Sequence, residues 1–541
     1  MRIFFVGLYF ILLQFFVSAQ SKIDVLHYKF CIILNDKNDT IIGYAEIRVR
    51  FIQPASSIAI DLTSLNKQGK GMKVDNIVSE DNKTIGNFAL ENDKLNIPFS
   101  KTYAANDITE FTIFYHGIPD DGLIISKNKY GDRTFFADNW PNRAHHWIPC
   151  VDDPADKASF EFIVIAPSRY QVISNGALIN NDDESPSAQM KVPGLTRTHW
   201  KEDVPLSTKV MVIGVAKFAV KEFADSPAGI PVSAWVYPQD STKGFHNYSV
   251  APGILKFLSA YIGPYPYNKL ANVQSKTIFG GMENASAIFY DESSASSSRS
   301  VESLLAHEIT HQWFGDMASE KSFAHLWLSE GFATYMTHIY IESKYGTDSM
   351  NHEMQTDRRQ IIAFAKESSR PVVDSASALM DLLNANSYQK GSWVLHMLRR
   401  QLGDSIFHQI IRSYYDRYKG KNADTRDFEA VAEEVSGKNL DAFFYQWLYT
   451  PGLPQLHITW KYVEKEKIVS ITVEQTQKAP AFVFPLELLF KPSVGNPFVK
   501  TINITKATET FSIPVVAGPV KIDPDPNISL LFEGITEESK N

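Results

Sequence analysis

Cysteine, positive charge and long apolar runs are all scarce in this sequence. Its 541 residues contain two cysteines, Cys31 and Cys150, so a structural zinc site built from cysteines is not expected. The two thiols can pair in an oxidising compartment, but buried free thiols are the expectation for two residues so far apart. The formal net charge of −8 argues against a nucleic-acid-binding protein, which is usually basic.

A long apolar run is found only at the N-terminus. Met1 and Arg2 precede an apolar segment at 3–17, and Val-Ser-Ala at 17–19 offers small residues for cleavage. This pattern predicts a signal peptide over residues 1–19 and an exported protein, periplasmic or extracellular. An uncleaved membrane anchor is the alternative, but the run is short for a membrane span. No later segment is long and apolar enough to cross a bilayer, so no stable membrane insertion is expected after cleavage.

The length and composition are typical of a globular protein of about three or four domains. Residues 20–219 predict an antiparallel β domain, because extended segments alternate there with Asn, Asp and Gly clusters and no helical pattern intervenes. The extended segments are 28–34, 40–51, 57–62, 110–115, 159–166 and 209–215.

Helical periodicity follows over residues 220–450, after a short extended segment at 232–237. Thr-Pro-Gly-Leu-Pro at 450–454 marks a boundary. Residues 451–541 then predict a small β-sandwich and a polar tail. The fold class is therefore multidomain α+β, and nothing in the sequence predicts a large C-terminal helical domain.

One motif carries metal chemistry. His307, Glu308 and His311 form His-Glu-x-x-His, and Glu330 follows after eighteen residues. On a helix, His307 and His311 lie one turn apart on one face and can bind a single Zn²⁺, with Glu330 on a second helix as third ligand. The fourth position is then left for a water, which Glu308 can deprotonate as general base. The alternative is an ordinary amphipathic helix with two incidental histidines.

Two further segments are weak signals when taken alone. Gly280 and Gly281 precede Met282, Glu283 and Asn284, a pattern that a plain turn also explains. Residues 388–391 open a predicted helix that runs to Gly403, and a tyrosine such as Tyr388 at such a place is usually a packing residue.

Taken together, the motifs resemble those of the M1 family of zinc aminopeptidases, gluzincins that include aminopeptidase N and leukotriene A4 hydrolase. The extended strings are similar too, namely His-Glu-Ile-Thr-His-Gln-Trp-Phe-Gly-Asp at 307–316 and Trp-Leu-Ser-Glu-Gly-Phe-Ala at 327–333. Residues 280–284 are similar to the family's Gly-x-Met-Glu-Asn motif, and residues 388–391 to its Tyr-x-Lys-Gly motif. The resemblance covers nearly the whole mature chain.

The resemblance implies a thermolysin-like catalytic domain over residues 220–450 with one Zn²⁺ per chain. It implies that Glu283 binds the α-amino group of a peptide and that Tyr388 donates to the developing oxyanion. The substrate-binding residues implied are Phe279, Gly280, Gly281, Met282, Glu283 and Asn284, and the expected partners are peptides with a free N-terminus. Phe279 and Met282 would line the first side-chain pocket, which suggests an apolar or broad preference.

The sequence departs from the family pattern in the N-terminal domain. Many members carry a Gln or Glu before the Pro-Cys run as a second contact to the amine. Here the corresponding place is 138–140, with Asp138 and Asn139 as candidate replacements. Three rival functions are a thermolysin-like endopeptidase, a catalytically silent peptide-binding protein and a side activity as an epoxide hydrolase. The second of these is disfavoured because every residue of the predicted machinery is present.

Overall fold

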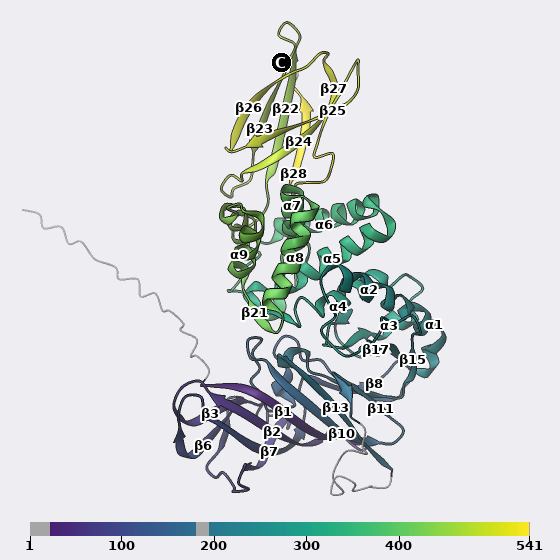
Figure 1. Cartoon of the computed structure of the whole chain (residues 1–541), viewed down its shortest axis with the longest axis vertical. Coiled ribbons are helices and arrows are strands. Elements are labelled where there is room, and N and C mark those ends of the chain that lie inside the picture. The colour runs from purple at the N-terminus through teal and green to yellow at the C-terminus, as the bar shows by residue number, and fades with distance from the viewer. Residues whose placement is uncertain (1–21, 180–193, 540–541) are drawn as a thin grey trace, which may run out of the picture.

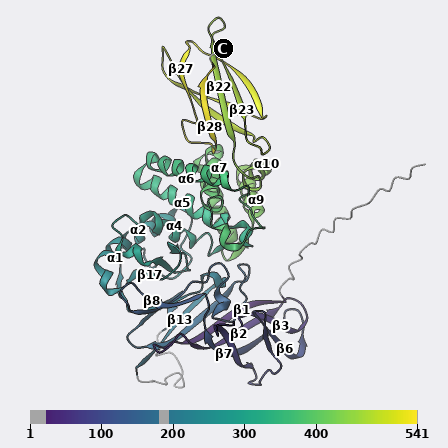
Figure 2. The same cartoon turned by 180° about the vertical axis from the view of Figure 1, so that it is seen from behind.

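The computed structural model describes residues 22–179 and 194–539, so the predicted signal peptide lies outside the described residues. A β domain lies at one end of the molecule, a mainly helical region in the middle and a second β domain at the other end (Figures 1 and 2). This arrangement confirms the predicted fold class. No described helix combines the length and the hydropathy that crossing a membrane requires.

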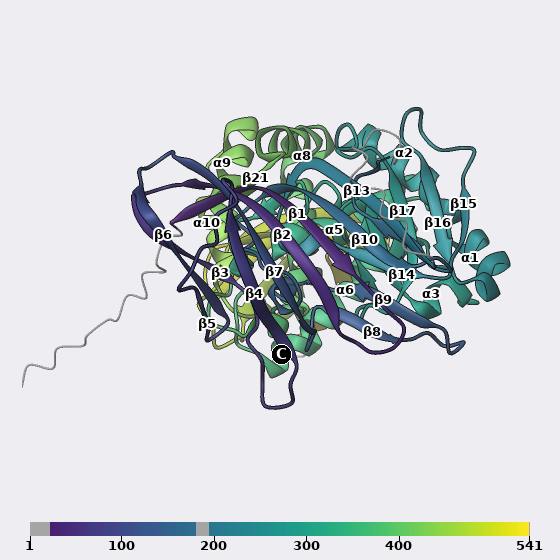
Figure 3. The same cartoon turned by 90° about the horizontal axis from the view of Figure 1, so that it is seen from below.

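A seven-stranded sheet dominates the N-terminal domain, with its long strands side by side in Figure 3. Its order is β12-β13-β10-β1-β2-β7-β4, and every pair is antiparallel except β1 with β10, which is parallel. The strands are β1 (Ile23–Ile33), β2 (Ile41–Phe51), β4 (Gly71–Ser79), β7 (Ile108–Ile118), β10 (Ala158–Pro167), β12 (Ala177–Leu178) and β13 (Leu195–Leu206). Burial alternates along β2, so one face of the sheet forms the core.

Two smaller sheets complete this domain. A four-stranded sheet has the order β11-β14-β9-β8 and a three-stranded sheet the order β3-β6-β5. Their strands are β3 (Ala55–Asp61), β5 (Ala89–Glu91), β6 (Lys94–Tyr103), β8 (Leu123–Lys127), β9 (Arg133–Ala137), β11 (Gln171–Ser174) and β14 (Ile213–Ala216). The strand predicted at 209–215 is wrong in its first half, because Thr208–Val210 form a 3-10 turn before β14. Both cysteines are buried free thiols, as expected.

The central region begins with a five-stranded sheet that the sequence prediction missed apart from one strand. Its order is β15-β16-β17-β19-β18, and β16, β17 and β19 run parallel. The strands are β15 (Ala219–Glu222), β16 (Val232–Val236), β17 (Leu270–Ser275), β18 (Gly281–Met282) and β19 (Ala287–Asp291). All six residues of β17 are buried. The strand therefore lacks the alternation of apolar and polar residues that marks a strand with one solvent-exposed face.

Helices form the rest of the central region. Their bounds are α1 (Ser241–Asn247), α2 (Ala251–Tyr261), α3 (Glu292–Ser296), α4 (Glu302–His311), α5 (Trp327–Tyr345), α6 (Thr347–Glu367), α7 (Gly391–Leu402), α8 (Asp404–Tyr418), α9 (Thr425–Ser436) and α10 (Asp441–Phe444). Two short strands, β20 (Ala318–Glu320) and β21 (Lys421–Ala423), pair between them. The helix α5 is buried on every side over residues 327–341, which makes it the centre of this region.

Two sheets form the C-terminal β domain, in the orders β26-β23-β22-β28 and β25-β24-β27. The strands are β22 (Gln455–Val463), β23 (Ile468–Gln475), β24 (Phe484–Pro492), β25 (Phe498–Ile504), β26 (Thr508–Pro514), β27 (Pro519–Pro524) and β28 (Glu533–Glu538). The predicted polar tail is partly wrong, because Glu537 and Glu538 belong to β28, which pairs in parallel with β22. The polar side chains of β28 are largely exposed, so they do not show the apolar alternation that predicts a strand.

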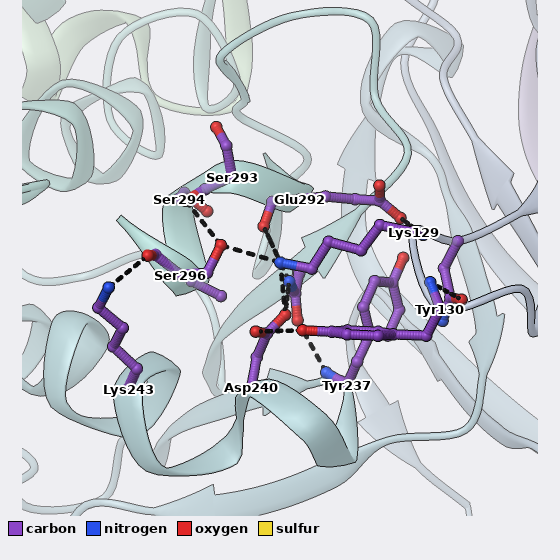
Figure 4. Close-up of polar contacts among 12 residues, drawn as sticks. Lys129, Tyr130, Tyr237, Asp240, Lys243, Glu292, Ser293, Ser294 and Ser296 are labelled. Carbon is purple, nitrogen blue, oxygen red and sulfur yellow. Dashed lines mark hydrogen bonds and ion pairs between the residues drawn. The ribbon is translucent and has the colours of Figure 1, made fainter. Parts of the chain in front are cut away.

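A polar cluster fastens the N-terminal domain to the central region (Figure 4). Lys129 and Tyr130, in the loop between β8 and β9, both reach Asp240, with Nζ and the hydroxyl at 2.8 and 2.7 Å from its carboxylate oxygens. Gln274 at the end of β17 donates to the same carboxylate at 2.6 Å. The cluster therefore anchors the strand that leads into residues 276–283, the segment predicted to bind substrate.

Candidate active site

The helices α4 and α5 bring the three predicted metal ligands together. Nε2 of His307 and Nε2 of His311 lie 3.1 Å apart, and each lies 3.2 Å from Oε2 of Glu330. Two ligands of a tetrahedral Zn²⁺ with bonds of about 2.0 Å are separated by about 3.3 Å. The donor set and its spacing therefore fit a tetrahedral metal ion with one position left over.

The neighbours of the ligands support this geometry. Nδ1 of His311 lies 3.1 Å from the carbonyl oxygen of Phe314 and 3.0 Å from Oγ of Ser329. A proton held on Nδ1 by the carbonyl leaves Nε2 to bind the metal. Burial would raise the pKa of Glu330, but His311 and His307 more than offset it, so this pKa lies well below its usual range. Glu330 is therefore ionised, which is the form in which a carboxylate can bind a metal ion.

Glu308 lies next to the metal ligands with its side chain largely buried. A Cβ atom added at Gly281 would lie 2.3 Å from its Oε1, so the glycine leaves the room that the carboxylate occupies. Burial raises the pKa of Glu308 well above its usual value, and the nearby Glu283 and Glu330 add to the rise while His311 opposes it. A carboxylate with a raised pKa is suited to accept a proton and return it.

Glu283 is a second buried carboxylate in the same place. Ligand atoms of Glu283, Glu308 and His311 lie within 4.8 Å of one another. The Glu283 backbone carbonyl accepts a hydrogen bond of 2.8 Å from Gln312 of the turn after α4, which fixes the loop against the metal-binding helix. Burial raises the pKa of Glu283, and the charge of Glu330 raises it further. A cationic group placed here would relieve this repulsion.

Tyr388 lies in a π-helical turn, Asn386–Lys390, directly before α7. Its ring is nearly parallel to that of His307, with 5.9 Å between the centroids. Burial raises the pKa of its hydroxyl well above 10, so the group stays protonated at neutral pH and can donate a hydrogen bond.

These groups line one cavity of about 310 Å³. Its wall contains the three metal ligands, Glu308, Tyr388 and residues 279–283, together with Trp140, Leu304 and Leu383. The structure thus brings together the predicted site residues, except Asn284 and the two candidates Asp138 and Asn139. No Lys or Arg of the described chain lines the cavity.

Comparison with known proteins agrees with this arrangement. The model described as Peptidase M1 N-terminal domain matches residues 25–210, and the model described as Peptidase family M1 domain matches residues 247–447. The chain belongs to the M1 peptidase family.

Relatives in this family come from distant organisms. Aminopeptidase M1-C of Oryza sativa subsp. japonica is 29% identical over 440 residues, which are 75% of this chain and 46% of the relative. Probable aminopeptidase 2 of Sulfurisphaera tokodaii is 29% identical over 335 residues, 58% of this chain and 41% of the relative. Glutamyl aminopeptidase of Bitis rhinoceros is 28% identical over 340 residues, 60% of this chain and 35% of the relative. The matches thus span less than half the length of each of these relatives.

The structure places three candidate residues of this M1 site outside the cavity wall. Asp138 is fully buried and accepts hydrogen bonds from Arg143, from Oγ1 of Thr277 and from the backbone N–H of Ile278, at 2.7 to 3.0 Å. Asn139 is also fully buried, and its amide donates to backbone carbonyls at 2.6 and 3.1 Å. Neither lines the cavity, so neither is placed to contact a substrate amine.

Asn284 is the third of these residues. Its side chain is fully buried and its Nδ2 faces the Met282 carbonyl at 3.5 Å, outside the cavity wall. In turn, sequence reasoning missed three residues that do line the cavity, Trp140, Leu304 and Leu383. Leu304 lies one turn before His307, so helical spacing was a signal for it. Trp140 and Leu383 carry no local signal, because they reach the site only through tertiary packing.

Proposed function

We propose that this M1 family chain is a zinc-dependent aminopeptidase that removes N-terminal residues from peptides. The observation that carries the proposal is the convergence of a metal-ligand set, a proton acceptor and an amine-binding carboxylate on one cavity. His307, His311 and Glu330 would hold one Zn²⁺ per chain. When bound, the ion would polarise the scissile carbonyl and lower the pKa of a water.

Three residues of the chain would bind the substrate, transfer the proton and stabilise the oxyanion. Glu283 binds the α-ammonium group of the substrate, which places the first peptide bond one residue away. Glu308 accepts the proton of the attacking water and delivers it to the departing amine, a role that its raised pKa supports. The Tyr388 hydroxyl, protonated at neutral pH, donates to the oxyanion; removing one such donor commonly costs on the order of 10²–10³ in rate.

We further propose where the enzyme acts and on which peptides. The apolar N-terminal run supports export to a periplasmic or extracellular space. The cluster of Glu283, Glu308 and Glu330 supports peptides with a free, cationic N-terminus as substrates.

The test is hydrolysis of Ala-, Leu- and Arg-p-nitroanilide by the purified mature chain. The assay is run with and without a zinc chelator, beside Glu308→Gln and with N-acetyl-Leu-p-nitroanilide as control substrate. We expect cleavage of the free-amine substrates only, sensitive to the chelator and lost in Glu308→Gln.

Other outcomes point to the rival functions. Equal cleavage of the acetylated substrate would remove the role of Glu283 and favour a thermolysin-like endopeptidase. No cleavage of any substrate by zinc-loaded protein would favour a peptide-binding protein without catalysis.

A further inference from the structure

We propose that Trp140 determines the specificity of this site by closing the pocket for the first substrate side chain with an aromatic wall. The inference rests on the proposed aminopeptidase function. It assigns the preferred substrates as peptides whose first residue is apolar and large, such as Leu, Met or Phe, with acidic first residues excluded.

The position of Trp140 is the first argument. The residue comes from the N-terminal domain, yet it lines the cavity formed by the central region. Its ring meets that of Phe279 edge to face, with 5.8 Å between the centroids, and meets that of Phe323 in the same way at 5.7 Å. Only 2% of Trp140 is exposed, so its ring is fixed by packing.

A rigid support holds this wall in place. Nε of Arg143 donates to the Trp140 carbonyl at 2.8 Å, and Asp138 accepts from Thr277 and Ile278 on the other segment. Arg143 also donates to Asp138 at 2.7 Å within the first segment, and the two hydrogen bonds that Asp138 accepts join this segment to the second. Trp140 and Phe279 therefore form one surface that is arranged before a substrate arrives.

The chemistry of the cavity is the second argument. Its groups other than the metal ligands, Glu308 and Glu283 are apolar or aromatic, namely Trp140, Phe279, Met282, Leu304, Leu383 and Tyr388, apart from two glycines. The Trp140 indole offers one N–H donor and no acceptor, so it cannot accept a hydrogen bond from a cationic amine. The wall instead favours burial of a hydrocarbon side chain, which is worth about 25 cal/mol for each Å² removed from water.

An acidic first side chain finds no partner here. The Arg143 guanidinium lies over the Phe279 ring, 5.9 Å from the centroid, and is paired with Asp138 and Asp121. Lys209, whose Nζ lies 5.8 Å from the centroid of Phe323, is paired with Glu320. No Lys or Arg of the described residues lines the cavity itself. A glutamate side chain would therefore lose its hydration beside Glu283 and Glu308 without compensation.

The experiment compares kcat/KM for Leu-, Ala-, Arg- and Glu-p-nitroanilide in the wild type, Trp140→Ala and Trp140→Phe. In the wild type we expect Leu to exceed Ala and Arg, and Glu to be lower than Leu by at least about 100-fold. Trp140→Ala should lower the Leu-to-Ala ratio about tenfold, chiefly through KM for Leu, because one lost apolar contact is worth roughly 10–200-fold in discrimination. Trp140→Phe should restore much of that ratio.

A matched control is Trp447→Phe, which changes another buried tryptophan that does not line the cavity and should keep the wild-type ranking. Wild-type cleavage of the Glu substrate within tenfold of Leu would overturn the inference, whether or not Trp140→Ala folds. Unchanged Leu-to-Ala ratios in a folded Trp140→Phe and Trp140→Ala would do the same. Absence of all aminopeptidase activity in the wild type would instead overturn the proposed function.

Discussion

Gly281 and Glu308 are in direct contact, with no room for even a methyl group between them. A Cβ atom at Gly281 would lie 2.3 Å from Oε1 and 2.6 Å from Cγ of the glutamate. The glycine lies in β18 and the glutamate in α4, so this contact sets how closely residues 279–283 approach the helix that carries two of the proposed metal ligands.

The first prediction follows from this contact. Gly281→Ala should displace the Glu308 carboxylate and lower kcat by roughly 10²-fold, since a misplacement of about 1 Å can cost that much. Zinc content should stay at one per chain, because none of the three ligands is changed. The measurement is kcat for Leu-p-nitroanilide together with metal analysis.

The neighbouring glycine provides the control. An added Cβ at Gly280 meets no heavy atom within 4 Å, so Gly280→Ala should cause a much smaller loss. Equal losses in the two variants would show that the contact with Glu308 is not the cause.

The second prediction concerns Ser329, whose hydroxyl lies 3.0 Å from Nδ1 of His311. Removing a group that orients a metal ligand typically lowers metal affinity about 10–100-fold. We expect Ser329→Ala to raise the dissociation constant for Zn²⁺ by at least about tenfold, measured by competition with a chromophoric chelator. Thr337→Ala removes a buried hydroxyl from the same helix, where it donates to the Ala333 carbonyl, and should leave the constant unchanged. A Ser329→Ala variant that binds Zn²⁺ as the wild type does would contradict this role.

Features with a strong local period were predictable from the sequence. The helix α5 ends at Tyr345, where Gly346 with φ of +89° takes a conformation that other residues avoid, and a glycine after an apolar stretch is a sequence signal for such an end. The spacing of His307 and His311 predicted a shared ligand face, and Glu330 completes it. These positions depend on helix geometry alone.

Features set by long-range packing were not predictable. The strands β17 and β19 are buried almost throughout, and β28 is largely exposed. None of the three shows the two-residue alternation of apolar and polar side chains that marks a strand in a sequence. The 138–140 segment shows the same limit within the site, since Asp138 turns into the protein and Trp140 lines the cavity. Whether a residue of this segment is buried in the protein or lines the cavity depends on its tertiary contacts, which the local sequence does not show.

The third prediction tests the crossing of α5 with the turn that carries Tyr388. A Cβ at Gly331 would lie 2.9 Å from backbone atoms of Gly391 and 3.2 Å from the carbonyl oxygen of Ser387. Backbone cannot rotate away as a side chain can, so Gly331→Ala should lower the free energy of unfolding by about 1–3 kcal/mol. Because the same displacement moves Tyr388, kcat should fall as well.

Urea unfolding and kcat for Leu-p-nitroanilide measure the two effects. Gly253→Ala in α2 is the matched control, because its Cβ meets nothing within 4 Å; it should be neutral or stabilising by about 0.4–1 kcal/mol. An unchanged free energy of unfolding in Gly331→Ala would show that α5 and the turn that carries Tyr388 can move apart without cost.

The last prediction concerns Asp156, a half-buried carboxylate in the N-terminal domain. Burial raises its pKa from 3.8 to about 7, and the charges of Asp24 and Asp153 add to the rise against one hydrogen bond from the Val25 N–H. Between these two values the folded state binds more protons than the unfolded state. The contribution of Asp156 to the free energy of unfolding therefore falls as the pH rises from about 4 to about 7.

Asp156→Asn removes this titration while keeping an oxygen that can accept from Val25. The variant should gain stability over the wild type across this pH range, by at least about 1 kcal/mol at pH 7, since one unit of pKa is worth about 1.4 kcal/mol. Urea unfolding at several pH values from 4 to 7 measures the difference. Asp225→Asn, at an exposed carboxylate, controls for the lost charge and should follow the wild-type curve. Parallel curves for Asp156→Asn and the wild type would mean that Asp156 ionises in the fold as it does in the unfolded chain.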